Sequence, residues 1–285
     1  MTGGDRLTPR EVGKFFEIQN LGLNLPFALA FLVLAARGVP ALVPTVLLVI
    51  AFVAARNAGH AFNRWTDRDL DAVNPRTQGR ALVTGRISPT TALGLVAANA
   101  VVLFVAAALL NRLALLLAPV ALVLLLGYSV TKRWSPLTTV YLGLVESITP
   151  AAVFIAITGT LPTYVLPAVL ALLAWGTAFE TIHSLGDLET DRHLRLPTLP
   201  GALGQRRSLA LVPVLHAVAL VLLAWFGALA HLAWPYFAGL AAMAVLAGAV
   251  DVTLARDPTR AQRPFRLHFV LGALYLVGAI GALVV

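Results

Sequence analysis

The sequence contains no cysteine and few charged residues. The absence of cysteine from its 285 residues excludes disulfide bonds, thiolate metal sites and cysteine nucleophiles. Only 12% of the residues are charged and 59% are hydrophobic, whereas about a quarter are charged in a typical soluble domain. The chain also lacks a glycine-rich phosphate loop and the His-Glu-x-x-His and Gly-x-Ser-x-Gly patterns. We therefore interpret it as an integral membrane protein.

Long apolar runs predict nine membrane-spanning helices. About 20 apolar residues are needed to cross the hydrocarbon core as a helix. The predicted spans lie at about residues 12–36, 41–63, 89–111, 113–131, 137–159, 163–185, 207–230, 234–253 and 267–285. The predicted fold class is thus all-α, a polytopic membrane protein with nine transmembrane helices around a central cavity. We expect residues 1–285 to form a single domain.

The basic residues predict the orientation of these spans. Eighteen of the 21 Lys and Arg residues fall in the N-terminal tail or in connections after even-numbered spans. Arg37 and Arg112 lie on the opposite side, and Arg56 lies within a span. Cytoplasmic loops carry an excess of Lys and Arg, so we expect a cytoplasmic N-terminus and an external C-terminus. The net charge of +8 is explained by this bias, and we expect no nucleic-acid partner.

A polar stretch at residues 56–71 ends the second predicted span. Asn63, Asp67 and Asp71 follow one another at intervals of four, so on a helix they share one face, whereas Asp69 points elsewhere. Oxygen ligands at the end of a membrane helix are what a hard divalent cation uses to hold an anionic substrate. The stretch predicts half of a metal site.

A second acidic stretch ends the sixth predicted span. Glu180, His183, Asp187 and Asp191 again fall on one helical stripe, while Glu189 faces away. Either stretch alone is also typical of a polar helix end with solvated carboxylates. Two stripes on one membrane side would repel each other unless cations lay between them, and Mg²⁺ suits carboxylates combined with phosphate oxygens. Together they favour a magnesium site.

Basic residues near the stripes suit a phosphate-containing ligand. Arg76 and Arg80 follow the first stripe, and Lys132 and Arg133 follow the fourth span. Arginine makes bidentate contacts with phosphate, and lysine supplies a point charge. The alternative for each is simple topology; we assign Arg133, like Arg192 and Arg195, to topology.

Several polar residues lie inside predicted spans. Arg56 is costly in lipid and therefore indicates a function, with Glu146, Glu180 or a substrate as its partner. Glu146 either pairs with Arg56 or contacts a substrate. Three further side chains line a cavity or form interhelical hydrogen bonds: Asn20, Asn24 and Tyr128.

These patterns resemble the UbiA family of intramembrane prenyltransferases. The first aspartate-rich motif and its loop are Asn63-x-x-x-Asp67-x-x-x-Asp71 and Arg76-Thr-x-x-Arg80-x-Leu; the second motif is Asp187-x-x-x-Asp191, and Tyr128-Ser-x-Thr-Lys132-Arg133 also corresponds. The sequence is most similar to bacterial quinone-pathway members that prenylate 4-hydroxybenzoate or a dihydroxynaphthoate, with ubiquinone or menaquinone as the final product. Arg64 stands where many members have Asp, and Glu180 and His183 stand where Asp and Tyr are expected.

The resemblance implies a mechanism and a set of site residues. Mg²⁺ would be held by Asn63, Asp67, Asp71, Asp187 and Asp191 and would bind a polyprenyl diphosphate. Arg76, Arg80 and Lys132 would assist the leaving diphosphate. A small aromatic acceptor would attack the allylic cation in a pocket to which we assign Asn20, Arg56, Tyr128, Glu146, Glu180 and His183. The family resemblance also implies a prokaryotic-type inner or plasma membrane, with the active site on the cytoplasmic side.

Two alternatives remain at this point. The same chemistry could act on haem, a glycerol-phosphate lipid or a chlorin as acceptor. A transporter or non-catalytic lipid-binding protein could also use acidic helix faces, although its ligands should then lie near the midplane.

Overall fold

The computed structural model describes residues 9–75, 77–194, 196–257 and 262–285, and each regular element within them is a helix. The helices group into two compact units. Unit 1 comprises Met1–Leu21 and Val46–Thr131, and unit 2 comprises Gly22–Thr45 and Lys132–Val285. The chain therefore enters each unit twice.

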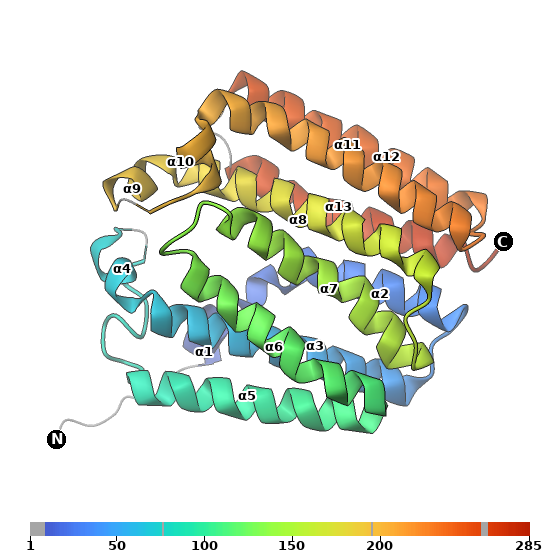
Figure 1. Cartoon of the computed structure of the whole chain (residues 1–285), viewed down its shortest axis with the longest axis horizontal. Coiled ribbons are helices and arrows are strands. Elements are labelled where there is room, and N and C mark those ends of the chain that lie inside the picture. The colour runs from blue at the N-terminus through green and yellow to red at the C-terminus, as the bar shows by residue number, and fades with distance from the viewer. Residues whose placement is uncertain (1–8, 76, 195, 258–261) are drawn as a thin grey trace. The chain divides into compact units, whose positions relative to one another are not determined.

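Unit 1 is built around small residues on its long helices. Its elements are α1 (Pro9–Phe15), η1 (Ile18–Asn20), α3 (Leu42–Thr66, in unit 1 from Val46), α4 (Arg68–Val73), α5 (Pro89–Leu110) and α6 (Arg112–Thr131) (Figure 1). Ala51 and Ala54 of α3 pack with Leu103 and Ala106 of α5 and with Ala118 of α6. Small side chains let membrane helices approach closely, so these alanines favour tight packing.

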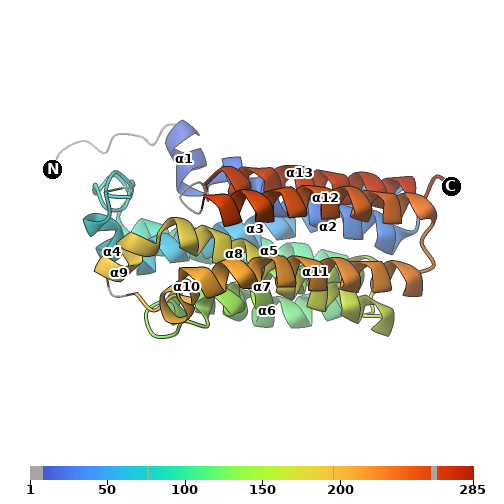
Figure 2. The same ribbon diagram turned by 90° about the horizontal axis from the view of Figure 1, so that it is seen from above.

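Unit 2 is a bundle of long helices that run side by side (Figures 1 and 2). Its elements are α2 (Leu21–Ala36), α7 (Thr138–Thr158), η2 (Thr163–Val165), α8 (Leu166–Gly186), α9 (Leu188–His193), α10 (Leu199–Leu203), α11 (Gln205–Leu229), α12 (Trp234–Arg256) and α13 (Gln262–Gly281). Helices α7 and α11 both pack against α8, while α12 packs against α11 and α13. Helix α8 is consequently the central helix of this unit.

Two glycines bring α7 and α8 into backbone contact. A Cβ atom at Gly143 would lie 2.5 Å from the carbonyl oxygen of Leu173, and one at Gly176 would lie 2.9 Å from the Cα of Gly143. Only glycine permits this approach. The same crossing seats the carboxylate of Glu146 against α8, because its Oε2 would lie 2.6 Å from a Cβ at Gly176.

Seven helices in the described part of the chain are long and apolar enough to cross a membrane. Two shorter apolar helices, Leu21–Ala36 and Leu267–Gly281, correspond to the first and last predicted spans. The protein is thus a multi-pass helical membrane protein.

The prediction of one continuous helix over residues 12–36 is wrong. Helix α1 ends at Phe15, and Glu17 adopts a left-handed conformation with φ 49° before η1 and α2 begin. Arg56 of α3 donates hydrogen bonds to the carbonyl oxygens of Phe16 (2.7 Å) and Glu17 (2.9 Å). The break is therefore stabilised by a side chain that is distant in sequence, which satisfies carbonyl groups left open where α1 ends.

Candidate functional site

The first acidic stripe lies in unit 1, where the helix breaks at Asp67. Helix α3 ends at Thr66, and Asp67 has φ −89° and ψ 0° before α4 begins. The backbone N–H of Asp67 still donates to Asn63 O (2.9 Å), and that of Asp71 donates to Asp67 O (2.8 Å). Four-residue hydrogen bonding thus continues through the break, and the stripe keeps its helical spacing.

The two aspartate side chains of this stripe have polar partners within unit 1. Asn63 Nδ2 donates to Asp67 Oδ2 at 3.0 Å, and Arg80 Nη1 lies 2.6 Å from both carboxylate oxygens of Asp71. Asp67 and Asp71 are 1% and 6% exposed. The Thr77 hydroxyl donates to the carbonyl oxygen of Asp71 (3.1 Å), which fastens the following loop to α4. The loop therefore returns Arg80 to the stripe that precedes it.

A second charged cluster surrounds Glu17. Arg64, 5% exposed, forms an ion pair with Glu17; Asn20 Nδ2 donates to Glu17 Oε2 (3.0 Å); and Arg80 Nη2 lies 3.9 Å from Glu17 Oε1. Burial raises the pKa of the Glu17 carboxyl, but Arg64 and the hydrogen bonds outweigh it, so this pKa lies below its ordinary value of 4.5. Arg64 thus neutralises a partly buried carboxylate.

Two predicted pocket residues are held at this turn. Asn20 bonds to Glu17, and Arg56 donates to backbone carbonyls where an acidic partner was expected. Tyr128 lies on α6 in the same unit. Arg76 lies outside the described residues, so its placement is not part of the structure.

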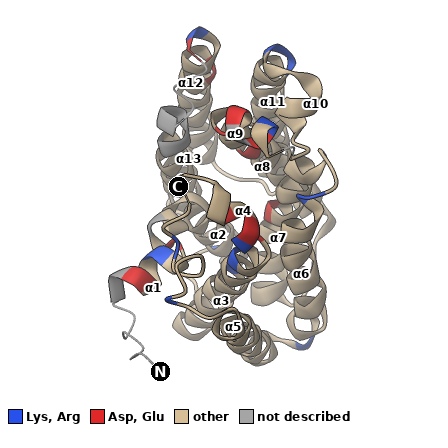
Figure 3. Ribbon diagram, turned by 90° about the vertical axis from the view of Figure 1, so that its left-hand side faces the viewer, with Lys and Arg blue, Asp and Glu red and all other residues tan. Residues whose placement is uncertain are grey.

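The second stripe, in unit 2, repeats the break of the first. Helix α8 ends at Gly186, and Asp187 has φ −106° and ψ 6° before α9 begins. The N–H of Asp191 donates to Asp187 O at 2.9 Å, and His183 Nε2 lies 3.8 Å from Asp187 Oδ2. The acidic segments of both units lie on short helices, α4 and α9 (Figure 3). Both values of φ and ψ belong to a sparsely allowed region in which active-site residues are frequent.

Negative charge is in excess at this second stripe. Burial and the neighbouring Asp187 carboxylate raise the pKa of Asp191 to about 6, and Glu180 adds to the rise. Lys132 and His183 oppose it. The predicted residues Lys132, Glu180 and His183 therefore lie within electrostatic range of Asp191.

The donor chemistry of the two stripes fits Mg²⁺. In the described ranges no three His, Asp or Glu side chains converge as a metal-binding group. Each unit instead offers two carboxylates four residues apart, and Mg²⁺ typically takes one or two carboxylates and completes its shell with water and phosphate oxygens. The pKa of Asp191 is raised first by burial and then by the Asp187 carboxylate, and a nearby cation would favour the charged form of this carboxyl group. The candidate ligands are Asn63, Asp67 and Asp71 in unit 1 and, separately, Asp187 and Asp191 in unit 2.

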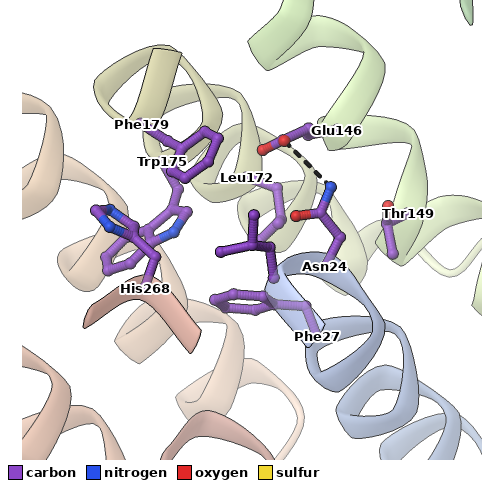
Figure 4. A pocket seen from close by; sticks show the side chains of 9 residues that line it. Asn24, Phe27, Glu146, Thr149, Leu172, Trp175, Phe179 and His268 are labelled. Carbon is purple, nitrogen blue, oxygen red and sulfur yellow. Dashed lines mark hydrogen bonds between the residues drawn. The ribbon is translucent and has the colours of Figure 1, made fainter. Parts of the chain in front are cut away.

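A pocket lies inside unit 2, lined by side chains of α2, α7, α8 and α13 (Figure 4). Its polar residues on α2 and α7 are Asn24, Glu146 and Thr149, and Asn24 Nδ2 donates to Glu146 Oε1 at 3.3 Å. Among the residues predicted to line the acceptor pocket, Glu146 lines this cavity. Glu180 lies within electrostatic range of Glu146. At about 20 Å³ the cavity is little more than water-sized, and Glu146 forms part of its wall.

The sequence did not reveal the aromatic lining of this pocket. Phe27, Trp175, Phe179 and His268 line it, but apolar side chains on membrane helices look the same whether they face lipid or a cavity. The one signal in the sequence is His268, a polar residue within the apolar ninth predicted span.

The fold defines a polytopic membrane protein with two acidic helix ends. Residues 24–272 match the UbiA prenyltransferase family, and the chain belongs to this family. It is accordingly an intramembrane prenyltransferase, which sets the transporter alternative aside.

Similar proteins have been named or solved. The chain is 35% identical to a 4-hydroxybenzoate octaprenyltransferase of Cupriavidus necator over 86% of each chain, and 32% identical to one of Neisseria meningitidis over 72% of this chain and 69% of that one. The apo structure of a UbiA homologue from Aeropyrum pernix is 32% identical, with a TM-score of 0.83 over 93% of this chain and 98% of that one. A UbiA homologue from Archaeoglobus fulgidus bound to GPP and Mg²⁺, 19% identical with a TM-score of 0.69 over 96% and 100%, shares the fold.

Proposed function

We propose that this protein transfers a polyprenyl group from a polyprenyl diphosphate to 4-hydroxybenzoate, a step of ubiquinone biosynthesis, and requires Mg²⁺. The observation that carries the proposal is the 35% identity, over most of both chains, to relatives named for this reaction. The two aspartate breaks support it, because each unit presents carboxylates suited to a magnesium diphosphate.

The polar residues at the two acidic helix ends bind the donor. Asn63, Asp67 and Asp71, with Asp187 and Asp191, position the metal-bound diphosphate. Mg²⁺ held by these residues would neutralise the negative charge that develops on the diphosphate as the allylic carbon–oxygen bond breaks.

Basic side chains complete the diphosphate site. Arg76, Arg80 and Lys132 donate N–H groups to the leaving diphosphate, and Arg80 does so from its position beside Asp71. A ring carbon of the acceptor then attacks the allylic cation, which Tyr128 stabilises through its aromatic face. That carbon loses its proton to the released diphosphate, which restores the aromatic ring. The surrounding apolar helices exclude water, which would otherwise capture the cation.

The proposal includes the topology. Nine membrane helices form one domain in a bacterial inner or plasma membrane. The N-terminus and the site lie on the cytoplasmic side and the C-terminus outside, and a single central cavity receives the donor and the acceptor.

An acceptor panel tests the function. Membranes containing the protein are incubated with labelled geranyl diphosphate and, separately, 4-hydroxybenzoate, a dihydroxynaphthoate, haem or a glycerol-phosphate lipid, with Mg²⁺ or with a chelator. The expected result is labelled prenyl-4-hydroxybenzoate that forms only with Mg²⁺. Preferential labelling of another acceptor overturns the assignment.

The matched variants are Asp67→Ala and Asp69→Ala. Asp67 is 1% exposed on the stripe, whereas the Asp69 side chain is 71% exposed and lies 3.7 Å from Arg68. Loss of transfer in the first variant alone is expected. Substantial turnover by Asp67→Ala would contradict the metal role.

A further inference from the structure

Within unit 1, the end of α1 packs against the loop that connects α4 with α5 and carries Arg80. Phe15, the last residue of α1, and Phe16 are 5% and 8% exposed and belong to one apolar cluster with Leu82 and Ile87 of this loop. Aromatic side chains bury a large apolar area, so this contact holds the loop against α1. Arg80 lies two residues before Leu82, and its backbone is therefore held with the loop.

Polar contacts fasten the same loop. Arg86 forms an ion pair with Glu11 of α1, and its Nη2 donates to the carbonyl oxygen of Gly79 at 3.2 Å. One arginine thus ties α1 to the residue that precedes Arg80. The loop is consequently fixed relative to the turn at Glu17, which follows α1 by two residues.

The Glu17 carboxylate has partners on both of its oxygens. Oε1 forms the ion pair with Arg64 Nη2, and Oε2 accepts a hydrogen bond from Asn20 Nδ2 at 3.0 Å. The Arg64 side chain is only 6% exposed, and a buried guanidinium is costly without a counter-charge, so Arg64 keeps the Glu17 carboxylate beside it. The orientation of Glu17 is therefore set before any ligand binds.

Arg80 lies between two carboxylates. Its Nη1 is 2.6 Å from both oxygens of Asp71, and its Nη2 is 3.9 Å from Glu17 Oε1. In the proposed site Asp71 is a ligand of Mg²⁺, and a metal ion and a guanidinium on one carboxylate repel each other because their charges have the same sign. A cation on Asp71 would thus weaken the contact of Asp71 with Arg80. Glu17 would then remain as the anionic partner of Arg80.

We infer that Glu17 is a positioning residue of the diphosphate site: it retains Arg80 beside the first stripe when Mg²⁺ binds Asp71, so that Arg80 can donate to the diphosphate. The inference rests on the proposed function, which supplies the diphosphate and its metal. It adds to the site a turn that lies outside both aspartate motifs. Glu17 acts through Arg80 and does not touch the ligand, because a carboxylate and a diphosphate repel each other.

Calorimetric titration of the purified full-length protein with inorganic pyrophosphate in the presence of Mg²⁺ tests this without catalysis, because pyrophosphate has no prenyl group to transfer. Glu17→Gln keeps the shape of the side chain and removes its charge. We expect the affinity for pyrophosphate to fall about tenfold, which is within the range measured for interactions between contacting residues. Asp69→Asn is the matched control, since this side chain is 71% exposed, and it should bind as the wild type does. Unchanged affinity in Glu17→Gln would overturn the inference.

A double-mutant cycle separates positioning from a general loss of structure. In an Arg80→Ala background Glu17 has no guanidinium to position, so Glu17→Gln should change the affinity for pyrophosphate by less than about twofold. A similar loss in both backgrounds would show that Glu17 does not act through Arg80, and would overturn the inference. Thermal unfolding in detergent checks that each variant is folded at the temperature of the titration, and Arg80→Gln replaces Arg80→Ala if that variant is not.

The two proposals fail separately. If Glu17→Gln weakens pyrophosphate binding through Arg80 but the wild type does not prenylate 4-hydroxybenzoate, the proposed function fails and the role of Glu17 stands. If the wild type prenylates 4-hydroxybenzoate while Glu17→Gln binds pyrophosphate with unchanged affinity, the role of Glu17 fails and the function stands.

Discussion

The two acidic helix ends share a backbone design but differ in how their charge is balanced. In each, a long helix ends just before an aspartate near φ −100°, a six-residue helix follows, and a second aspartate donates its N–H back to the first. In unit 1, Arg80 contacts Asp71 and Asn63 contacts Asp67. In unit 2, Asp191 has a pKa of about 6 because burial and Asp187 disfavour its charged form.

The two ends therefore share a backbone geometry but differ in the charges around their aspartates. The spacing of two aspartates across a helix break is common to both units, and it is the feature on which the proposed metal diphosphate site depends. An arginine contacts a stripe carboxylate directly in unit 1, where Arg80 pairs with Asp71 and so stabilises the protein before any ligand binds. The comparison therefore assigns a structural role to Arg80 and Arg64 in addition to any contact with substrate.

The largest expected effect is the loss of catalysis when either first aspartate is changed. Asp67→Asn and Asp187→Asn should each lower kcat for Mg²⁺-dependent prenyl transfer by about 10²–10³-fold. Each substitution removes a negative charge proposed to hold Mg²⁺, and Mg²⁺ would stabilise the leaving diphosphate in the transition state. Initial rates at saturating donor and acceptor measure this.

Exposed neighbours provide the controls for this pair. Asp69→Asn on α4 and Glu189→Gln on α9 remove equivalent charges outside the stripes and should retain wild-type rates. If only one of the two stripe variants lost activity, the functional equivalence of the two ends would be disproved.

A smaller effect, different for the two ends, is expected on the stability of the metal-free protein. Asp71→Asn removes the partner of Arg80 and should lower the free energy of unfolding by about 1–3 kcal/mol. Asp191→Asn relieves repulsion from Asp187 and should leave stability unchanged or raise it. Thermal unfolding in detergent with a chelator measures both. Shifts of the same sign and size would show that the two ends do not differ in charge balance.

The smallest effect concerns Glu17. Its folded-state pKa is depressed, so its contribution to stability is present above its ordinary value of 4.5 and is lost as the pH falls through the lower folded value. Glu17→Gln should therefore cost on the order of 1 kcal/mol near neutral pH. The difference from the wild type should vanish in acid. A difference that did not change between neutral pH and acid would exclude the ion pair with Arg64 as its cause.

The sequence was most informative where periodicity and composition determine structure. The predicted span at 89–111 is observed as α5 (Pro89–Leu110), and that at 137–159 as α7 (Thr138–Thr158), since apolar length sets both. The four-residue spacing of the aspartates was also visible.

The features that could not be predicted from the sequence depend on contacts between residues that are distant in the chain. The break at Glu17 is stabilised by Arg56, 39 residues later, and no local signal announces it. Both stripes were predicted as continuous helices, yet each breaks at its first aspartate. The aromatic lining around Trp175 can be predicted only if the packing faces of the helices are known. The sequence of a uniformly apolar span does not show which face packs inward.

The turn at Glu17 also affects how the protein is made. Arg56 enters the membrane within α3, and an arginine at the centre of a span costs about 2.5–3.5 kcal/mol on insertion scales. The two carbonyl groups that accept its hydrogen bonds, and the Glu17 carboxylate that interacts with it electrostatically, precede α3 in the chain. They are therefore already synthesised when α3 leaves the ribosome, so the partners of Arg56 exist before its span is inserted.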